Sequence, residues 1–281
     1  MSLLSAAVPV EAVLRRPHGL LEGPRFGPDG ALVYSDVTSG GLFACAPEGL
    51  VSELLGRRRG IGGVLAHARG GWVISGRTVL HLEPAGGQRE LLAEEGACGY
   101  NDLFATAAGE LLAGELRYRP MAGDPPRNGR LLLLGADGAV RVLSEQITWP
   151  NGIGLAPDGE TVYVSDYAHS AVLRTSLAGE PAVQFARMPS GSADGLAVDC
   201  EGGVWVALGE AGAVARLRPD GTLHETIALP AGFVSSISFG GPDLMDVLIS
   251  TADNHVSPEL GGTLLLARSE IPGLPVAPVA L

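Results

Sequence analysis

Four oxygen-bearing side chains occur at corresponding points of a repeated sequence pattern. They are Glu22, Asn101, Asn151 and Asp194. Two carboxylates and two amides form a hard, all-oxygen donor set, which suits Ca²⁺, Mg²⁺ or Mn²⁺ better than a thiophilic ion. Zinc is an alternative, although a zinc site without histidine or cysteine would be unusual. The sequence therefore predicts one divalent-cation site, provided that the fold brings the four positions together.

Each of these residues also has an ordinary structural interpretation. Asn151-Gly152 and Asp194-Gly195 are common turn dipeptides, and an isolated Glu22 would most simply be a solvated loop carboxylate. Two of the repeats lack a strong oxygen donor, because they carry Ile61-Gly62-Gly63 and Ser235-Ser236 at the corresponding point. The shared position in the other four repeats is the feature that favours a ligand set.

The stretch around Asn151 shows the repeated pattern most clearly. Pro157-Asp158-Gly159 lies between two apolar runs. Proline presets φ, aspartate can hydrogen-bond to nearby backbone, and glycine tolerates a positive φ, so this tripeptide predicts a turn. The flanking runs Ile153–Ala156 and Thr161–Val164 are therefore expected to form two antiparallel strands, with Asn151 just before the first.

Six copies of this pattern follow one another along the chain. They begin near Glu22, Ile61, Asn101, Asn151, Asp194 and Ser235. The spacing of roughly forty residues is typical of a four-stranded propeller blade, and a single blade cannot bury both faces of its sheet. We therefore expect an all-β, six-bladed β-propeller, formed as one domain by residues 1–281. The metal site is expected at one end of the central channel, where the inner strands begin.

Two segments lie outside the regular repeats. Tyr118–Asn128 lengthens the third copy and is expected to be an inserted loop. Val10–Arg16 alternates loosely before the first copy. Because the two ends of a closed propeller commonly share a blade, which removes open sheet edges, Val10–Arg16 is expected to supply the strand that completes the last blade.

Composition limits the classes of function. The chain of 281 residues has a formal net charge of −12, which disfavours nucleic acid as a partner because such binding needs a basic footprint. No apolar run approaches a transmembrane span, and the N-terminus lacks the basic start of a signal peptide. Three scattered cysteines fit a reducing compartment. The expected protein is cytoplasmic, binds neither nucleic acid nor membrane, and is a monomer or weak homo-oligomer.

Several of the repeated steps resemble the motifs of a known family. They are Glu22-Gly23-Pro24, Pro150-Asn151-Gly152 and Ala193-Asp194-Gly195, and Phe239–Leu244 is similar to the family's last blade. Over nearly its whole length the chain resembles the senescence marker protein (regucalcin), gluconolactonase and luciferin-regenerating enzyme family. The resemblance implies a propeller with one divalent metal held by Glu22, Asn151 and Asp194, and with Asn101 as a fourth ligand or a substrate contact. Ca²⁺ is the first expectation, with Zn²⁺, Mn²⁺ and Mg²⁺ as alternatives.

The resemblance also implies an activity, because family members mostly hydrolyse lactones or related esters. The expected protein is a metal-dependent lactonase that opens a sugar-type or related lactone to the hydroxy acid. Asp194 is the expected general base; if it binds metal tightly, hydroxide formed at the metal or the outer carboxylate of Glu115 would take that role, because a cation lowers the pKa of its ligand. The alternatives are an organophosphate or ester hydrolase on the same site, and a non-enzymatic calcium-binding propeller.

The third copy departs from the sugar-lactonase pattern of the family. Many members carry an arginine two residues before the asparagine of the third blade, and this chain has Gly99 there. The resemblance therefore leaves open whether the small-molecule substrate is a sugar lactone or another lactone or ester. The local candidates to bind it are Tyr100, Asn101, Glu115, Arg117 and Tyr118.

Overall fold

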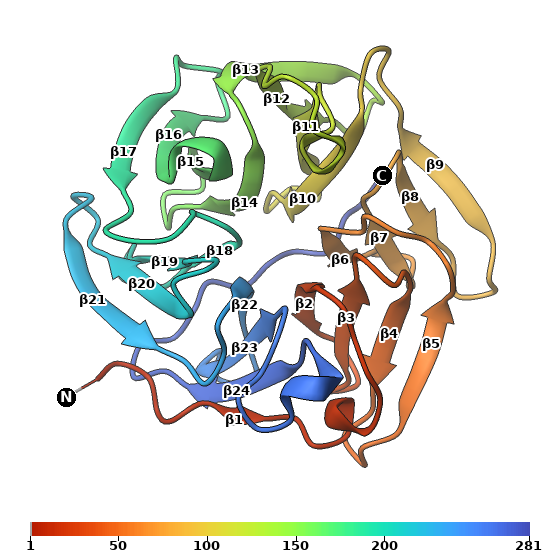
Figure 1. Ribbon diagram of the computed structural model, residues 1–281. Helices are drawn as coiled ribbons and strands as arrows, with labels where there is room; N and C mark the ends of the chain where they lie inside the picture. The colour runs from red at the N-terminus through yellow and green to blue at the C-terminus, as the bar shows by residue number, and fades with distance from the viewer. Residues whose placement is uncertain (1) are drawn as a thin grey trace.

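The computed structural model describes residues 2–281 as six four-stranded antiparallel sheets arranged around a central channel (Figure 1). The first three sheets are blades 1 to 3. Blade 1 consists of β2 (Leu21–Phe26), β3 (Leu32–Asp36), β4 (Leu42–Cys45) and β5 (Val51–Leu55). Blade 2 consists of β6 (Val64–Ala66), β7 (Trp72–Ile74), β8 (Val79–Leu82) and β9 (Gln88–Leu92). Blade 3 consists of β10 (Gly99–Ala105), β11 (Leu111–Leu116), β12 (Gly129–Leu134) and β13 (Val140–Ile147).

The remaining sheets complete the ring. Blade 4 consists of β14 (Pro150–Leu155), β15 (Thr161–Asp166), β16 (Ala171–Ser176) and β17 (Val183–Arg187). Blade 5 consists of β18 (Leu196–Val198), β19 (Val204–Ala207), β20 (Ala213–Leu217) and β21 (Leu223–Ala228). Blade 6 consists of β22 (Val234–Gly240), β23 (Asp246–Thr251), β24 (Leu264–Arg268) and β1 (Val8–Pro9). Within residues 2–281, four short 3₁₀ helices lie in the connections: η1 (Val13–Arg15), η2 (Pro120–Ala122), η3 (Tyr167–His169) and η4 (Pro258–Leu260). The six-bladed prediction is confirmed.

The predicted turn of blade 4 forms as its sequence indicates. Asp158 Oδ1 accepts hydrogen bonds from the backbone N–H of Glu160 and Thr161, at 2.9 and 2.8 Å. Gly159 has φ +73°, a conformation that an L side chain rarely adopts. This turn fixes the register of β14 on β15, in which Ile153 faces Val164.

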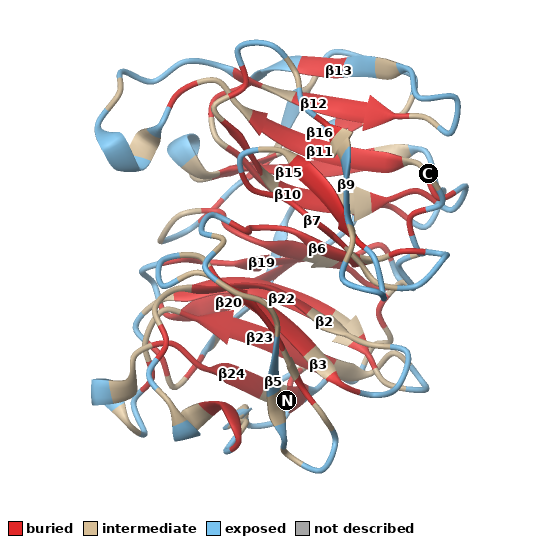
Figure 2. Cartoon of the chain, turned by 90° about the vertical axis from the view of Figure 1, so that its right-hand side faces the viewer, coloured by how far each residue is buried: buried red, intermediate tan, exposed pale blue. Residues whose placement is uncertain are grey.

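The apolar core is divided among the spaces between neighbouring blades. One cluster packs Leu112 and Leu131 of blade 3 against Ile153 and Val162 of blade 4, and all four are buried. Figure 2 shows the same distribution, with buried residues along the strands and exposed residues mainly in the connecting loops. Because each sheet buries its faces on its two neighbours, the stability of each blade depends on closure of the ring.

Ring closure uses a different N-terminal segment from the one predicted. Val8–Pro9 pairs with β24, with Val8 opposite Leu266, whereas Val13–Arg15 is helical. The prediction that Val10–Arg16 supplies the closing strand is therefore wrong. The chain turns away because the backbone N–H of Val13 bonds to the carbonyl of Val10 at 2.9 Å. Loose alternation could not distinguish an extended segment from this tight turn.

A C-terminal segment, residues 272–281, crosses one end of the channel; we call it the strap (Figure 1). The N–H of Leu274 bonds to the carbonyl of Val198 in blade 5 at 2.9 Å. The N–H of Val279 bonds to the carbonyl of Ala66 in blade 2, also at 2.9 Å. The strap therefore links opposite sides of the ring. Of the helices within residues 2–281, none has the length and apolar character needed to cross a membrane.

Candidate active site

The four predicted donor residues meet at the end of the channel opposite the strap. All four line one cavity of about 790 Å³. The Asn151 side chain donates from Nδ2 to Oδ1 of Asp194. Asn101 Nδ2 donates to the carbonyl of Pro150 at 3.2 Å. Glu22, Asn151 and Asp194 are only 7%, 6% and 3% exposed, so the interpretation of Glu22 as a solvated loop residue does not hold.

A strand irregularity accompanies three of the four residues. The register of β2 on β3 shifts between Glu22 and Arg25. The same shift occurs between Tyr100 and Leu103 in blade 3 and between Pro150 and Ile153 in blade 4. Such bulges bend a strand and redirect its side chains. We infer that they help to aim Glu22, Asn101 and Asn151 at the channel axis.

The glycine that follows a donor residue serves contact between blades in two cases. The N–H of Gly152 bonds to the carbonyl of Asp194 at 3.2 Å, and the N–H of Gly195 bonds to the carbonyl of Ser235 at 2.8 Å. A Cβ on Gly152 would collide with the backbone of Leu196. Asn151-Gly152 is thus a site of close strand approach inside β14 rather than the isolated turn that its composition also allows.

The donor residues share a buried acidic environment. Burial, followed by the nearby charges of Asp194 and Asp102, raises the pKa of Glu22. Burial and then Asp102 raise the pKa of Asp194, which the hydrogen bond from Asn151 partly offsets. Burial also raises the pKa of Asp102 to about 6 despite the charge of Arg25. A bound divalent cation would relieve this repulsion, so the chemistry and electrostatics of the donor set fit a metal site.

One positively charged side chain, that of Arg25, lies next to this acidic group. Arg25 Nη2 lies 3.9 Å from Oδ1 of Asp102. Asp102 is further held by the backbone N–H of Leu103 at 2.7 Å. Within residues 2–281 there is no cluster of three or more histidine, cysteine, aspartate or glutamate side chains arranged to hold a metal. The candidate site instead combines two carboxylates with two amides.

One wall of the cavity is aromatic. The ring centroid of Trp149 lies 4.6 Å from that of Tyr167 and 6.4 Å from that of Tyr118. Phe233 and Met121 also line the cavity, and Met121, in the inserted loop, is 89% exposed. Sequence reasoning did not nominate Trp149, Tyr167, Phe233 or Met121. Trp149 lies two residues before Asn151, so its proximity to a donor was the available signal.

The five predicted substrate contacts divide into two groups. Tyr100, Asn101 and Tyr118 line the cavity. Glu115 and Arg117 do not belong to its lining. The Glu115 carboxylate is fully buried and accepts hydrogen bonds from Arg117 Nε at 2.6 Å and Arg130 Nε at 3.1 Å. This ion network gives Glu115 a structural role. It offers no geometric support for the prediction that Glu115 acts as an outer base. The functional roles of all five residues stay predictions.

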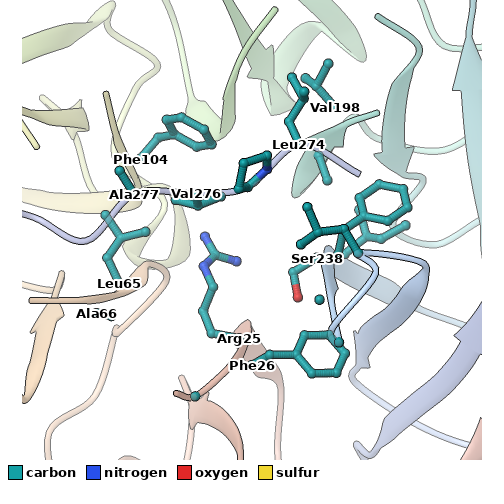
Figure 3. Close-up of a pocket in the computed structure, with 18 of the residues that line it drawn as sticks. Arg25, Phe26, Leu65, Ala66, Phe104, Val198, Ser238, Leu274, Val276 and Ala277 are labelled. Atoms are coloured by element: carbon teal, nitrogen blue, oxygen red, sulfur yellow. The ribbon is translucent and has the colours of Figure 1, made fainter. Parts of the chain in front are cut away.

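The opposite end of the channel has different chemistry (Figure 3). A cavity of about 500 Å³ there is lined by Leu65, Phe104 and Val276, among other apolar residues. Arg25 and Ser238 also line it, as Figure 3 shows. Leu274 and Val276 belong to the strap, which covers this end. The clustered oxygen donors are therefore confined to the open end, which we call the mouth.

This geometry defines a class of protein. It is a six-bladed propeller in which buried carboxylate and amide side chains cluster at one end of the channel. Residues 20–253 match the family described as SMP-30/Gluconolactonase/LRE-like region, so the chain belongs to this family. The family prediction is thereby confirmed.

Three known proteins illustrate the relationship. The chain is 32% identical to the 6-deoxy-6-sulfogluconolactonase of Pseudomonas putida, over 94% of this chain and 96% of that protein. It is 30% identical to a pentonolactonase of Haloferax volcanii, over 82% and 81% of the two chains. The solved structure of a calcium-binding protein, regucalcin, from Agrobacterium tumefaciens has a TM-score of 0.83, 23% identity, and coverage of 99% of this chain and 98% of that one. The last comparison supports the fold alone.

Proposed function

We propose that this protein is a divalent-metal-dependent lactonase that opens a sugar-type or related lactone to the hydroxy acid. The observation that carries the proposal is the convergence of Glu22, Asn101, Asn151 and Asp194 on the floor of one cavity. Two relatives at 32% and 30% identity are named as lactonases, which supports the reaction class.

The donor residues would hold one divalent ion. Glu22 and Asp194 supply negatively charged oxygens, and Asn151 would have to present Oδ1 instead of Nδ2 to act as a ligand. Asn101 uses its Nδ2 on the Pro150 carbonyl, which leaves its Oδ1 free as a fourth ligand or a substrate contact. Ca²⁺ suits an all-oxygen set. When bound, the ion would polarise the lactone carbonyl.

The protein's own groups orient the substrate and move the proton. The aromatic wall formed by Trp149, Tyr167 and Tyr118 gives a flat apolar surface for one face of a lactone ring. Asp194 is the candidate base for the attacking water, because it is a buried carboxylate that lines the cavity beside the other donor residues. Asn151 donates to the Asp194 carboxylate, and this hydrogen bond would be given up if Asn151 turned Oδ1 toward a bound ion.

The aromatic wall also gives a reason to keep a second candidate. A non-sugar ester or organophosphate offers more apolar surface to Trp149 and Tyr167 than a hydroxylated ring does. The same four donor residues would be required for either substrate. A substrate panel therefore separates the two activities, whereas mutation of the donors does not.

The test is hydrolysis of sugar lactones, aliphatic lactones, aryl esters and an organophosphate triester by protein stripped with a chelator and then reloaded. Ca²⁺, Mg²⁺, Mn²⁺ and Zn²⁺ are compared, and acid release is followed with a pH indicator. We expect turnover of at least one lactone only after reloading. Turnover confined to the aryl ester or the triester would support the second candidate. Metal-induced thermal stabilisation without turnover of any compound would instead favour a calcium-binding propeller.

A further inference from the structure

The wall of the mouth cavity contributed largely by blade 2 carries positive charge. Arg59, in the connection between β5 and β6, and Arg77, in the connection between β7 and β8, line the cavity and are exposed. We call these two residues the arginine pair. Its position contrasts with the acidic character of the whole chain, which has a net charge of −12.

The arginine pair is not neutralised by neighbouring carboxylates. In the part of the chain that the structure describes, neither Arg59 nor Arg77 forms an ion pair. Arg77 is held by a hydrogen bond from Nη1 to the carbonyl of Ala97. Arg119, a third arginine of the lining, differs because its guanidinium forms a two-pronged contact with Asp124 at 2.8 and 3.1 Å. Arg59 and Arg77 therefore offer uncompensated guanidinium groups.

Four glycines near the arginine pair in the sequence line the cavity. They are Gly60, Gly62, Gly76 and Gly99, and Cys98, Tyr100 and Asn101 line the cavity next to them. The acidic lining residues, Glu22 and Asp194, belong to the donor floor. Arg77 also lines an adjoining cavity of about 840 Å³ together with Glu94, Glu95 and Asp124. Glu94 forms an ion pair with Arg130, and Asp124 forms one with Arg119.

We propose that the arginine pair is a subsite for an anionic substituent of the lactone: a carboxylate, sulfonate or phosphate group remote from the ring carbonyl. The inference rests on the proposed lactonase function and specifies its substrate class. A guanidinium binds such oxyanions through paired N–H donors. Two uncompensated cations at the mouth also offset the repulsion that an acidic protein exerts on an anionic substrate. The ring lies on the aromatic wall, and its charged arm points toward Arg59 and Arg77.

The test compares six-carbon aldonolactones that carry a hydroxyl, carboxylate, sulfonate or phosphate at C6, using metal-loaded protein. We expect higher kcat/KM for at least one anionic compound than for the hydroxyl compound, and a decline in that advantage as salt rises. Arg59→Gln and Arg77→Gln should each lower kcat/KM for the anionic lactone about 10- to 100-fold, which corresponds to loss of a charged hydrogen bond. The hydroxyl lactone should change less than about twofold, since it lacks the group that these hydrogen bonds serve.

The matched control is Arg57→Gln. Arg57 is exposed and outside the cavity lining, so this variant changes the net charge equally without touching the subsite, and its rates should stay at the wild-type level. Equal preference for neutral and anionic lactones, with no selective loss in the arginine variants, would overturn the subsite while leaving lactonase function intact.

A second measurement does not require turnover. Calorimetry compares binding of gluconate with binding of its C6 carboxylate, sulfonate and phosphate analogues. We expect the wild-type protein to bind at least one dianionic acid more tightly, and each arginine variant to lose that difference. Failure of all lactones as substrates would contradict the proposed function. Unchanged binding in the arginine variants would contradict the subsite itself.

Discussion

Among the donor residues, Asp194 is held by hydrogen bonds to both its backbone and its side chain. Its backbone N–H bonds to the carbonyl of Ala207 at 2.9 Å, and its side chain accepts from Asn151. Burial and nearby acidic groups raise its pKa. The charges of the two carboxylates of the set, Glu22 and Asp194, oppose one another in this buried site. This cost is consistent with a functional site, because perturbed groups cluster where chemistry is done.

Asp194→Asn keeps the shape of the side chain and removes its charge and basicity. We expect kcat for the lactone to fall about 10²- to 10⁴-fold, the usual contribution of a positioned base, and metal binding to weaken. Steady-state kinetics at saturating metal measures the loss. Glu48→Gln, which alters an exposed carboxylate away from the cavity, is the matched control and should behave as wild type. A variant with near wild-type kcat would remove Asp194 from the proton transfer.

The closing strand and the strap determine how the elements form a ring. β1 covers the outer side of β24, and Leu4 just before it is only 5% exposed. The backbone N–H of Ser5 bonds to the carbonyl of Arg268 at 2.8 Å. This short segment protects an edge that would otherwise be open to another chain. It also ties the last blade to the segment that enters the first.

Deletion of residues 2–10 removes β1 and the Leu4 side chain. We expect the free energy of unfolding to fall by about 2–4 kcal/mol, from lost apolar burial and strand hydrogen bonds. The deleted protein should also associate through the exposed edge of β24. Urea unfolding and size-exclusion chromatography measure these effects. Val8→Ala is the control, because Val8 is 57% exposed and the change should stay within about 0.5 kcal/mol. An unchanged, monomeric deletion variant would show that closure does not need β1.

The inner strands and the donor positions could be predicted because they repeat with the same local chemistry. Pro157-Asp158-Gly159 contains its own turn mechanism, and Asn151 keeps a fixed position before it. The strap could not be predicted, because residues 272–281 form irregular backbone contacts without strand or helix periodicity. The buried state of Glu115 depends on Arg130, a partner fifteen positions along the chain. Such pairings become visible only when strands are placed side by side.

At the scale of the whole molecule, the two ends of the central channel carry different kinds of surface. The strap and apolar side chains such as Leu65 and Phe104 cover one channel end, while the donors, the aromatic wall and the arginine pair lie at the mouth. Under the proposed function, this polarity would give the substrate one productive orientation, with its carbonyl at the donor residues. The central claim is that lactone opening requires a bound divalent metal ion.

The most direct measurement of that claim is a Ca²⁺ titration of metal-stripped protein in which bound calcium and the initial rate of lactone opening are followed together. We predict one Ca²⁺ per chain and a rate that rises in proportion to occupancy. Glu22→Gln should weaken binding and turnover together, because it removes a charged ligand. Full turnover in excess chelator, or saturation with Ca²⁺ without a rise in rate on any lactone, would contradict the account.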